Sequence, residues 1–397
     1  MSKNSSRAAG RHFLQIPGPS PLPDRVLRAM DTPIIDHRGP EFAKLAKRAL
    51  EGIKTIFKTT NPVIIYTATG TGAWEGALVN TLSPGDRVLM VETGQFATLW
   101  KKMAERLGLT PEFITSDWRV PADPKAIEAK LREDKKHEIK AVCILHNETS
   151  TGALSDIAAI RKAIDAAKHP ALYMVDTISS LASVDYRHDE WGVDVTISGS
   201  QKGLMLPPGL GFNALSPRAI DASKSAKLPR SFWAWDEIIE TNKTGYFPYT
   251  PSTNLLYGLS EALEMIEAEG LENIFARHKR WSSGVRGAVD AWGLPVQCAD
   301  AELHSPILTG VILPAGIDAD ALRKLILERF DLSLGAGLGK LKGRTYRIGH
   351  LGNSNDLTLL ATLAGCEMGM KLAGVNLAGS GIESAMQYFA THPAKAA

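Results

Sequence analysis

The chain has 397 residues, of which 44% are hydrophobic and 22% are charged, a composition typical of a globular protein large enough for two domains. Its 45 basic and 43 acidic residues leave a formal net charge of +2, and no basic run is interleaved with aromatic side chains, so neither nucleic acid nor a membrane surface is an expected partner. No segment is apolar and long enough to span a bilayer. Small molecules are therefore the expected ligands.

The cysteines indicate the cellular compartment. Cys143, Cys298 and Cys366 are scattered and form no CxxC pair, which favours a reducing compartment and argues against a metal site or a disulfide framework. The basic N-terminal segment, residues 1–11, lacks an apolar stretch behind it and is typical of a tail rather than a signal peptide. We expect a cytoplasmic protein without a metal.

Helical and apolar segments alternate from about residue 40 to residue 215. Residues 40–57 place apolar side chains at helical spacing, and the apolar run 63–67 that follows predicts a strand. Further strands are predicted at residues 88–93, 112–116, 140–146, 171–176 and 195–200, with helical segments such as 155–168 between most of them. This alternation predicts crossover units and a mostly parallel α/β sheet covered by helices on both faces.

Polar, mostly glycine-containing loops follow four of these strands, at residues 67–72, 146–152, 175–180 and 198–203. In open α/β sheets, ligands bind beyond the carboxyl ends of the strands. The four loops therefore predict a ligand site at one edge of the sheet.

The pattern changes beyond about residue 255. The long helical stretch 254–281 is followed by mixed short strands and helices, which we interpret as a smaller C-terminal domain. We place an N-terminal arm at residues 1–25, a large α/β domain at residues 26–270 and the small domain at residues 271–397.

Lys202 is the only charged residue between Asp194 and Arg218, in a run rich in Leu, Pro and Gly. Such a lysine either extends its ammonium group from a surface loop into water or lies in an apolar pocket. A pocket would lower its pKa and leave a neutral amine that can condense with a carbonyl. Strongly perturbed lysines cluster at active sites, so Lys202 is a candidate catalytic residue.

Residues 67–80 begin at a strand end, pass through a Gly/Thr loop and continue as a helical pattern. A helix N-terminus offers backbone N–H groups and the positive end of the helix dipole, so a phosphate fits there; a plain capped turn is the alternative. The glycine spacing is not that of a dinucleotide fingerprint, and the Gly-Lys-Ser/Thr of a P-loop is absent.

Asp176 ends the apolar run 171–175, so the predicted strand carries its carboxylate to the same edge of the sheet. A turn former or a helix cap is the plain alternative. A phosphate cradle, a rigid carboxylate and a lysine in an apolar pocket together match the requirements of pyridoxal 5′-phosphate (PLP). That cofactor needs a phosphate anchor, a partner for its ring nitrogen and a Schiff-base lysine. PLP is therefore the expected cofactor.

Seven segments carry a family resemblance: "PGPSPLPDRVLRAM", "TGTGAWEGALVNTLSPGD", "HNETSTG", "DEWGVDVTISGSQKGLMLPPGLG", "YFPYTPSTNLLYGL", "GLENIFARH" and "YRIGHLGN". In this order they closely resemble the class V aminotransferases of PLP fold-type I, and within them the serine/alanine–glyoxylate aminotransferases. The resemblance implies an aspartate aminotransferase-like fold with a large, mostly parallel-sheet domain and a smaller C-terminal α+β domain. It also implies a homodimer with the active site at the subunit interface.

The resemblance implies which residues bind the cofactor. Lys202 matches the lysine that holds PLP as a Schiff base and then acts as a general base, and Asp176 matches the partner of the pyridine nitrogen. The other matching positions are Thr69, Gly70, Thr71 and Gln201 at the phosphate, Phe96 stacked on the ring, Thr149 near the ring hydroxyl, and Tyr249 and Thr250 at the phosphate from the neighbouring subunit.

Arg347 matches the arginine that binds the substrate α-carboxylate, which a guanidinium meets bidentately and a lysine does not. Its apolar neighbours Ile348 and Leu351 favour a partly buried strand over a surface strand. His37 and Arg38 match a segment that reaches into the partner's active site and helps to select the amino donor. Some serine-preferring relatives have Tyr where this chain has His37.

The reaction expected from the resemblance is a transamination. A small L-amino acid, with serine favoured, gives its amino group to glyoxylate, so that glycine and a 2-oxo acid form; L-aspartate and L-alanine are the alternative donors. A class V lyase or cysteine desulfurase is a further alternative. A desulfurase, however, needs a nucleophilic cysteine on a mobile loop, whereas Cys366 falls in a helical pattern and Cys143 in a strand.

Two other classes of protein fit less well. A nicotinamide dehydrogenase would need a dinucleotide fingerprint, which residues 335–343 imitate only weakly because no helical pattern follows them. A non-catalytic relative would have no need of Lys202, Asp176 and Arg347.

Overall fold

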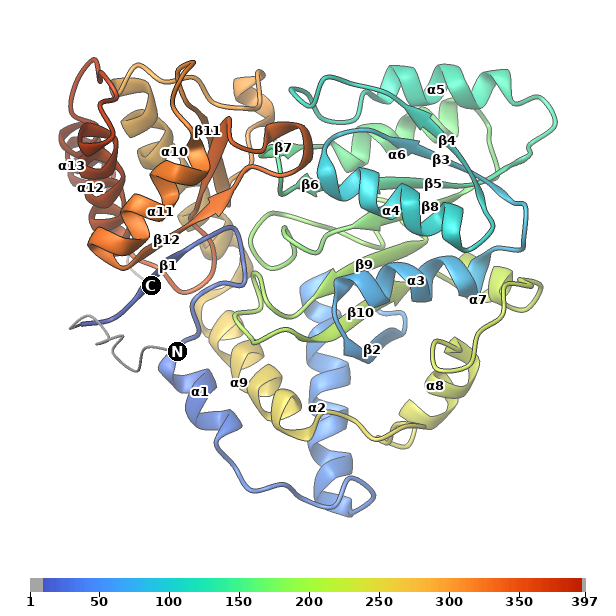
Figure 1. Cartoon of the computed structure of the whole chain (residues 1–397). Coiled ribbons are helices and arrows are strands. Elements are labelled where there is room, and N and C mark those ends of the chain that lie inside the picture. Colours follow the sequence, from blue (N-terminus) through green and yellow to red (C-terminus); the bar gives the residue numbers. More distant parts are fainter. Residues whose placement is uncertain (1–9, 395–397) are drawn as a thin grey trace, which may run out of the picture.

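The computed structural model describes residues 10–394. Residues 1–9, which form most of the expected N-terminal tail, lie outside the described part. Figure 1 shows a larger part built on a seven-stranded sheet and a smaller part built on a four-stranded sheet. The α/β fold class is confirmed, whereas the domain boundaries given above stay a prediction.

The seven-stranded sheet has the order β2-β10-β9-β8-β5-β3-β4. Its strands are β2 (Val63–Ala68), β3 (Arg87–Val91), β4 (Thr110–Ile114), β5 (Ile139–Leu145), β8 (Leu172–Asp176), β9 (Val195–Gly199) and β10 (Gly209–Leu215). The run from β9 to β4 is parallel, and only β10 is antiparallel to its neighbours, so the mostly parallel sheet is confirmed. All the predicted strands are present. The pattern does not predict β10, because prolines and glycines interrupt the apolar run at residues 207–211.

Helices cover both faces of this sheet (Figure 1). They are α1 (Asp24–Met30), α2 (Pro40–Phe57), α3 (Gly70–Thr81), α4 (Gln95–Arg106), α5 (Pro124–Glu133), α6 (Ile157–Ala166), α7 (Pro217–Ser223), α8 (Trp235–Asn242) and α9 (Thr253–Glu269). Alternate residues of each strand point to opposite faces. On β5, Val142 and Ile144 pack in the core with α2, α5, α6 and α9, whereas Cys143 and Leu145 pack in the core with α3, α4, α7 and α8.

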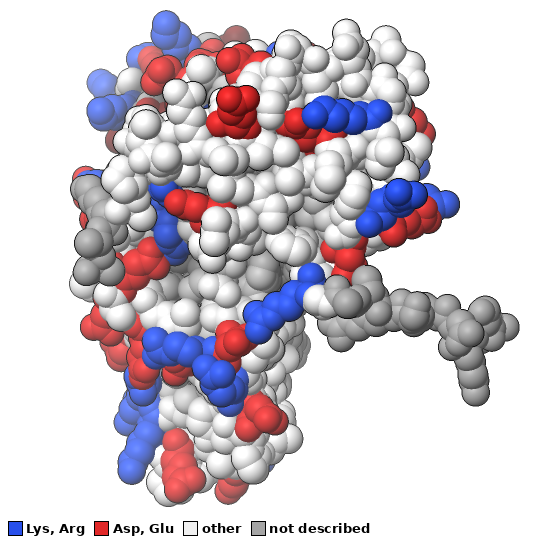
Figure 2. Space-filling model, turned by 90° about the vertical axis from the view of Figure 1, so that its left-hand side faces the viewer, with Lys and Arg blue, Asp and Glu red and all other residues white. Residues whose placement is uncertain are grey.

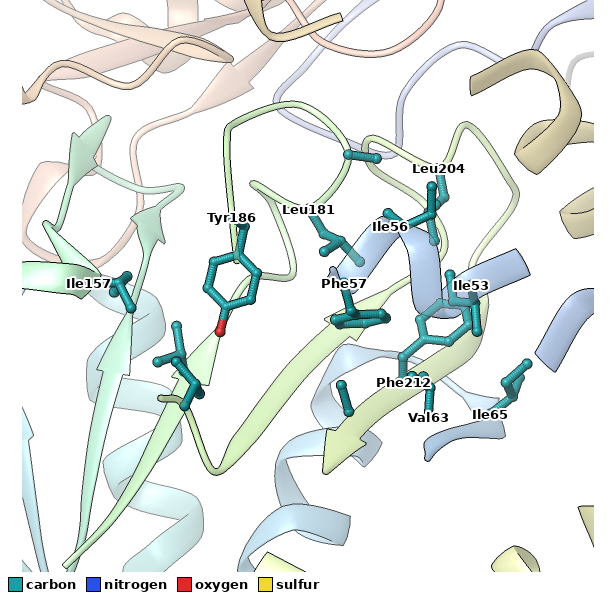
Figure 3. Close-up of a cluster of buried hydrophobic side chains, with 14 of the residues drawn as sticks. Ile53, Ile56, Phe57, Val63, Ile65, Ile157, Leu181, Tyr186, Leu204 and Phe212 are labelled. Carbon is teal, nitrogen blue, oxygen red and sulfur yellow. The ribbon is translucent and has the colours of Figure 1, made fainter. Parts of the chain in front are cut away.

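Helix α2 shows how the sequence builds the first of these cores. Pro40 occupies its first turn, where a missing N–H costs no hydrogen bond. The rings of Phe57, its last residue, and of Phe212 on β10 have centroids 6.4 Å apart. Figure 3 shows these rings beside Ile53 and Val63. Burial of each such side chain contributes about 1.5–3 kcal/mol, which fixes α2 against the sheet.

The smaller sheet has the order β1-β12-β13-β11. Its strands are β1 (Phe13–Gln15), β11 (Leu308–Ile312), β12 (Leu332–Ala336) and β13 (Thr345–Gly349), and the helices of this part are α10 (Leu271–Ala291), α11 (Ala319–Phe330), α12 (Asp356–Leu372) and α13 (Gly381–Thr391), with 3-10 turns at Ala301–Leu303 and Gly339–Leu341. Strand β1 pairs in parallel with β12, so the start of the described chain joins the C-terminal sheet. The helical stretch 254–281 is two helices, because Gly270, with φ 81°, separates α9 from α10.

The surface bears on possible partners. Within residues 10–394, no helix has both the length and the apolar character that a membrane span requires. On the face drawn in Figure 2, Lys and Arg side chains are interspersed with Asp and Glu side chains and form no extended basic area.

Candidate active site

A cavity lies at the carboxyl ends of the central strands, beside a two-stranded hairpin formed by β6 (Asn147–Glu148) and β7 (Ala153–Leu154). Its volume is about 480 Å³, part of which is open to solvent. Its lining residues are Gly70, Thr71, Trp74, Phe96, Leu145, Asn147, Thr149, Asp176, Ile178, Ser179, Gln201 and Lys202. The structure thus brings together Gly70, Thr71, Phe96, Thr149, Asp176, Gln201 and Lys202 of the candidate site residues. Thr69 directly precedes them as the N-cap residue of α3.

Lys202 lies in the turn that follows β9. Its side chain lines the cavity, and Nζ donates a 2.6 Å hydrogen bond to the carbonyl of Pro17. Burial, followed by the positive charge of Arg347, lowers the pKa of Lys202 to about 8, while the carboxylate of Asp176 opposes this shift. Half of the amine is therefore neutral near pH 8, in keeping with the expectation of a perturbed lysine.

Asp176 is the last residue of β8, and only 4% of it is exposed. Its Oδ1 accepts the backbone N–H of Ile178 at 2.6 Å, and its Oδ2 accepts the indole N–H of Trp74 at 2.9 Å. Burial raises the pKa of Asp176 to about 7, against the effect of these two hydrogen bonds. A protonated ring nitrogen of PLP beside Asp176 would form an ion pair with the buried carboxylate.

The loop after β2 leads into the N-terminus of α3. The side chain of Thr69 does not cap the first turn of α3, so the backbone N–H groups of that turn remain available to a ligand. A side chain at Gly70 would crowd this end, because its Cβ would lie 2.3 Å from Cδ1 of Ile178. A Cβ at Gly199 would lie 3.1 Å from the amide nitrogen of Gly70. The two glycines keep the helix N-terminus free of side chains, as an anion site at this end would require.

Two buried oxygens in the cavity wall lack a hydrogen-bond partner among residues 10–394: Oε1 of Gln201 and Oδ1 of Asn147. Buried polar groups are normally paired, so both atoms indicate a polar ligand. One cavity therefore holds an amine, a carboxylate, a helix N-terminus and unpaired polar atoms. This set of residues fits PLP.

Glu148, which the sequence analysis did not single out, joins two walls of the cavity. Its carboxylate accepts the backbone N–H groups of Phe96 at 3.3 Å and of Ala97 at 3.1 Å, at the start of α4. It also accepts the N–H of Ser150 at 3.0 Å. These bonds fix the turn that carries Phe96 relative to the hairpin that carries Thr149.

The sequence analysis also assigns no role to Trp74. A signal for it exists, because it lies four residues after Gly70 in the predicted helix and so on the same face as the phosphate loop. For Glu148 the signal is weaker: it is the only acidic residue of the loop 146–152.

Arg347 lies on β13 and is 7% exposed, as its apolar neighbours suggested for this strand. Its Nη1 donates to the carbonyl of Thr149 and its Nε to the carbonyl of Ala336, both at 2.7 Å. Burial lowers the pKa of Arg347 to about 10, whereas the negative charge of Glu148 opposes this. Because Thr149 lines the cavity, this hydrogen bond places the guanidinium at the rim of the cavity. The two hydrogen bonds use Nε and Nη1, so neither of them occupies Nη2.

Four candidate site residues lie away from the cavity. Tyr249 and Thr250 line a separate small pocket, where the ring of Tyr249 stacks on Phe232 with centroids 5.3 Å apart. His37 and Arg38 lie in the turn between α1 and α2, and Arg38 is exposed. A single chain does not bring these four residues to Lys202.

The cysteines and the residues 335–343 bear on the alternative classes. Cys143, Cys298 and Cys366 are all buried, unpaired thiols, and burial raises the pKa of each of them. None is an exposed nucleophile on a loop. Residues 335–343 end β12 and form a 3-10 turn before β13, so no helix N-terminus follows them.

The turn that carries Lys202 needs a glycine at position 203, because it has no room for a side chain there. A Cβ at this position would lie 2.1 Å from the backbone oxygen of Leu181 and 2.5 Å from Oγ of Ser183. Because a backbone oxygen cannot rotate away, the variant Gly203→Ala must displace the turn. We expect its free energy of unfolding to fall by about 1–3 kcal/mol, measured by urea denaturation.

Gly287→Ala is the matched control, since a Cβ there meets nothing closer than 3.7 Å inside α10. We expect this variant to be as stable as the parent or more stable by about 0.5–1 kcal/mol. Equal stability of the two alanine variants would show that the turn at Lys202 has room for a side chain.

A sheet that carries a lysine, a carboxylate and a helix N-terminus to one cavity at its carboxyl edge defines a class of protein. It is the class of PLP-dependent enzymes of fold-type I, and PLP is the cofactor.

Comparisons with known proteins narrow this class. The family model described as aminotransferase class-V matches residues 12–329, and the chain belongs to this family. It is 48% identical to a serine–glyoxylate aminotransferase of Hyphomicrobium methylovorum over 97% of this chain and 96% of the other. It is 47% identical to an L-aspartate–glyoxylate aminotransferase of Paracoccus denitrificans over 94% of this chain and 95% of the other. Among solved structures, a pyridoxamine–pyruvate aminotransferase of Mesorhizobium loti superposes with a TM-score of 0.90 at 28% identity, covering 97% of this chain and 98% of the other. The protein is a PLP-dependent aminotransferase.

Proposed function

We propose that the enzyme transfers the amino group of L-serine to glyoxylate, so that glycine and the 2-oxo acid of serine form. The observation that carries the proposal is the 48% identity to a serine–glyoxylate aminotransferase over 97% of the chain. L-Aspartate is the second candidate donor, because the relative named for that donor is 47% identical. Both reactions use the same cavity and the same acceptor.

The proposed roles follow from the chemistry of the cavity. When bound, PLP supplies an aldehyde for the amine and an electron-withdrawing ring. Lys202 would hold the aldehyde and then, once displaced by the donor, move the proton from the donor's Cα. Asp176 would hold the proton on the ring nitrogen, and the N-terminus of α3, with Gln201, would bind the phosphate.

The remaining contacts orient the reactants. Phe96 would lie against the ring, and Thr149 would hydrogen-bond near the ring hydroxyl. Arg347 would bind the α-carboxylate of the donor and then the carboxylate of glyoxylate, because a guanidinium offers two parallel N–H donors. The existing bonds from Arg347 to Ala336 and Thr149 would keep its side chain in place for both half-reactions.

We further propose a homodimer in which Tyr249 and Thr250 reach the phosphate, and His37 and Arg38 reach the donor, in the partner's cavity. In support of this, these residues lie outside the chain's own cavity, and Tyr249 is 37% exposed with Phe232 beside it at 38%. Sedimentation velocity tests this proposal, and a monomer with full activity would contradict it. The three unpaired cysteines favour the cytoplasm as the compartment.

The capture of PLP by the cofactor-free enzyme should depend on pH in a defined way. Condensation needs a neutral amine, and the pKa of Lys202 is lowered from 10.5 to about 8. The capture rate should therefore rise with pH around a midpoint near 8 and level off well below pH 10.5. Stopped-flow absorbance measures this rate. A midpoint at the ordinary lysine value would show that the pocket does not perturb the amine.

The proposed reaction is tested by glycine formation. Purified enzyme is incubated with glyoxylate and one donor at a time, and glycine and the 2-oxo acid are quantified together. We expect L-serine to give the highest kcat/KM. A higher value for L-aspartate would select the second candidate, and no glycine from any of L-serine, L-aspartate and L-alanine would refute the proposal.

A further inference from the structure

Trp74 makes the only side-chain hydrogen bond to Asp176 among residues 10–394. Its Nε1 donates to Oδ2 at 2.9 Å, and both residues are buried, with 3% and 4% of their surfaces exposed. Trp74 lines the cavity, and its ring stacks on that of Trp100 with centroids 5.7 Å apart and planes 12° apart. The indole is therefore fixed in place against the carboxylate.

We propose that Trp74 is a positioning residue for amino transfer: its indole N–H holds the Asp176 carboxylate ionised and oriented, so that the proton stays on the ring nitrogen of PLP. The inference rests on the role proposed for Asp176 and extends it to a cavity-lining residue that donates a hydrogen bond to Asp176. Trp74 acts through Asp176 and takes no proton itself.

The charges around Asp176 show why such a donor is needed. Burial and the nearby negative charge of Glu148 both favour the protonated carboxyl, whereas the hydrogen bonds from Ile178 and Trp74 and the positive charge of Lys202 favour the ionised one. A carboxyl that keeps its own proton leaves the ring nitrogen unprotonated, and an unprotonated ring withdraws electrons less strongly from Cα. Hydrogen bonds to an ionised oxygen are about twice as strong as neutral ones, so the donors at Oδ1 and Oδ2 counter the burial. Only the donor from Trp74 can be removed by changing a side chain, since Ile178 donates from its backbone.

Helix α3 gives the indole its placement. Gly70 and Trp74 are four residues apart on this helix and share a face, so one rigid element supplies both the anion site and the donor to Asp176. Trp100 of α4 packs against the indole from the core side. A shift of Trp74 would thus require movement of the helix that forms the phosphate end of the cavity.

The test measures where the proton lies. Holoenzyme is prepared with PLP carrying ¹⁵N at the ring nitrogen, whose chemical shift separates the protonated from the unprotonated ring, and spectra are recorded around pH 7. Trp74→Phe keeps an aromatic ring and removes the N–H. Trp100→Phe is the matched control, because it makes the same change in the stacked neighbour, whose buried Nε1 has no hydrogen-bond partner in the part of the chain that the structure describes.

We expect the parent and Trp100→Phe to show the shift of a protonated ring and Trp74→Phe to move toward the unprotonated value. In the same variant kcat should fall about tenfold, while KM for the amino donor stays within about twofold. An unchanged ¹⁵N shift in Trp74→Phe, or an equal change in Trp100→Phe, overturns the proposal.

The variant Asp176→Asn distinguishes a failure of the proposal about Trp74 from a failure of the role proposed for Asp176. If Asp176→Asn moves the shift and Trp74→Phe does not, only the inference about Trp74 is wrong. If neither variant moves it, the role proposed for Asp176 is wrong as well.

A second measurement needs no Trp74 variant and so covers the case in which Trp74→Phe fails to fold. The cofactor-free enzyme is labelled with ¹⁵N at its eight tryptophans, and the indole N–H signals are followed through pH 7. One signal should titrate with a midpoint near 7 and should lose that titration in Asp176→Asn. If no indole signal behaves in this way, Trp74 does not sense the charge of Asp176 and the proposal is overturned.

Discussion

Lys202→Ala should remove amino transfer almost completely, with kcat for L-serine and glyoxylate reduced by roughly 10⁴-fold or more. Two functions are lost together in this variant. The cofactor has no amine to hold its aldehyde, and no base remains to move the proton from the donor's Cα. Steady-state kinetics of the purified variant, supplied with excess PLP, measure the loss.

Two control variants give this result its meaning. Lys224→Ala removes a surface lysine whose side chain is 72% exposed, and it should leave kcat unchanged. Lys202→Arg keeps a positive charge in the cavity but offers no amine for condensation, so it should be as inactive as Lys202→Ala. Near-parental turnover by Lys202→Ala would exclude Lys202 as the catalytic amine.

Arg347→Ala should weaken the binding of both carboxylate substrates, with KM for L-serine and for glyoxylate raised by roughly 10- to 100-fold. The reason is the loss of a charge-assisted pair in a site where burial has already removed the water. Kinetics with each substrate varied in turn measure the two constants. An unchanged KM for glyoxylate would remove Arg347 from the site.

Arg347 also donates to the carbonyls of Ala336 and Thr149, so its removal lowers stability as well as affinity. Comparing L-serine with ethanolamine, its analogue without the carboxylate, separates the two effects. The inhibition constant of ethanolamine should change little in Arg347→Ala, whereas the affinity for L-serine falls. Arg344→Ala, an exposed neighbour three residues earlier, should behave like the parent enzyme.

Much of the fold could be predicted because its signals are local. The periodicity of residues 40–57 fixes the amphipathic helix α2, and the apolar run that ends in Asp176 fixes a buried strand with a carboxylate at its edge. Strand β10 is not predicted, because glycines interrupt its apolar pattern. These glycines are needed where β10 packs against α3 and β9. At Gly211, a Cβ would lie 2.7 Å from the backbone oxygen of Thr69.

The candidate site also contains some residues that the sequence predicts and others that it does not. Lys202, Asp176 and the N-terminus of α3 end or follow apolar elements, and the rule that ligands bind at the carboxyl edge of the sheet brings them together. Trp74 and Glu148 act through hydrogen bonds between elements distant in the chain, 102 residues apart for Trp74 and Asp176, and no spacing rule predicts such a pair. Tyr249 and His37 do not line this chain's cavity, and in the homodimer proposed above they would reach the cavity of a second subunit.

The absorption spectrum of the purified enzyme, recorded before and after addition of L-serine without any 2-oxo acid, tests the proposed amino transfer most directly. We expect a visible band from PLP bound at Lys202 that decays to the spectrum of pyridoxamine phosphate, faster with L-serine than with L-aspartate or L-alanine, and that returns when glyoxylate is added. A band that none of the three amino acids changes, or a protein that stays colourless after incubation with PLP, would contradict it.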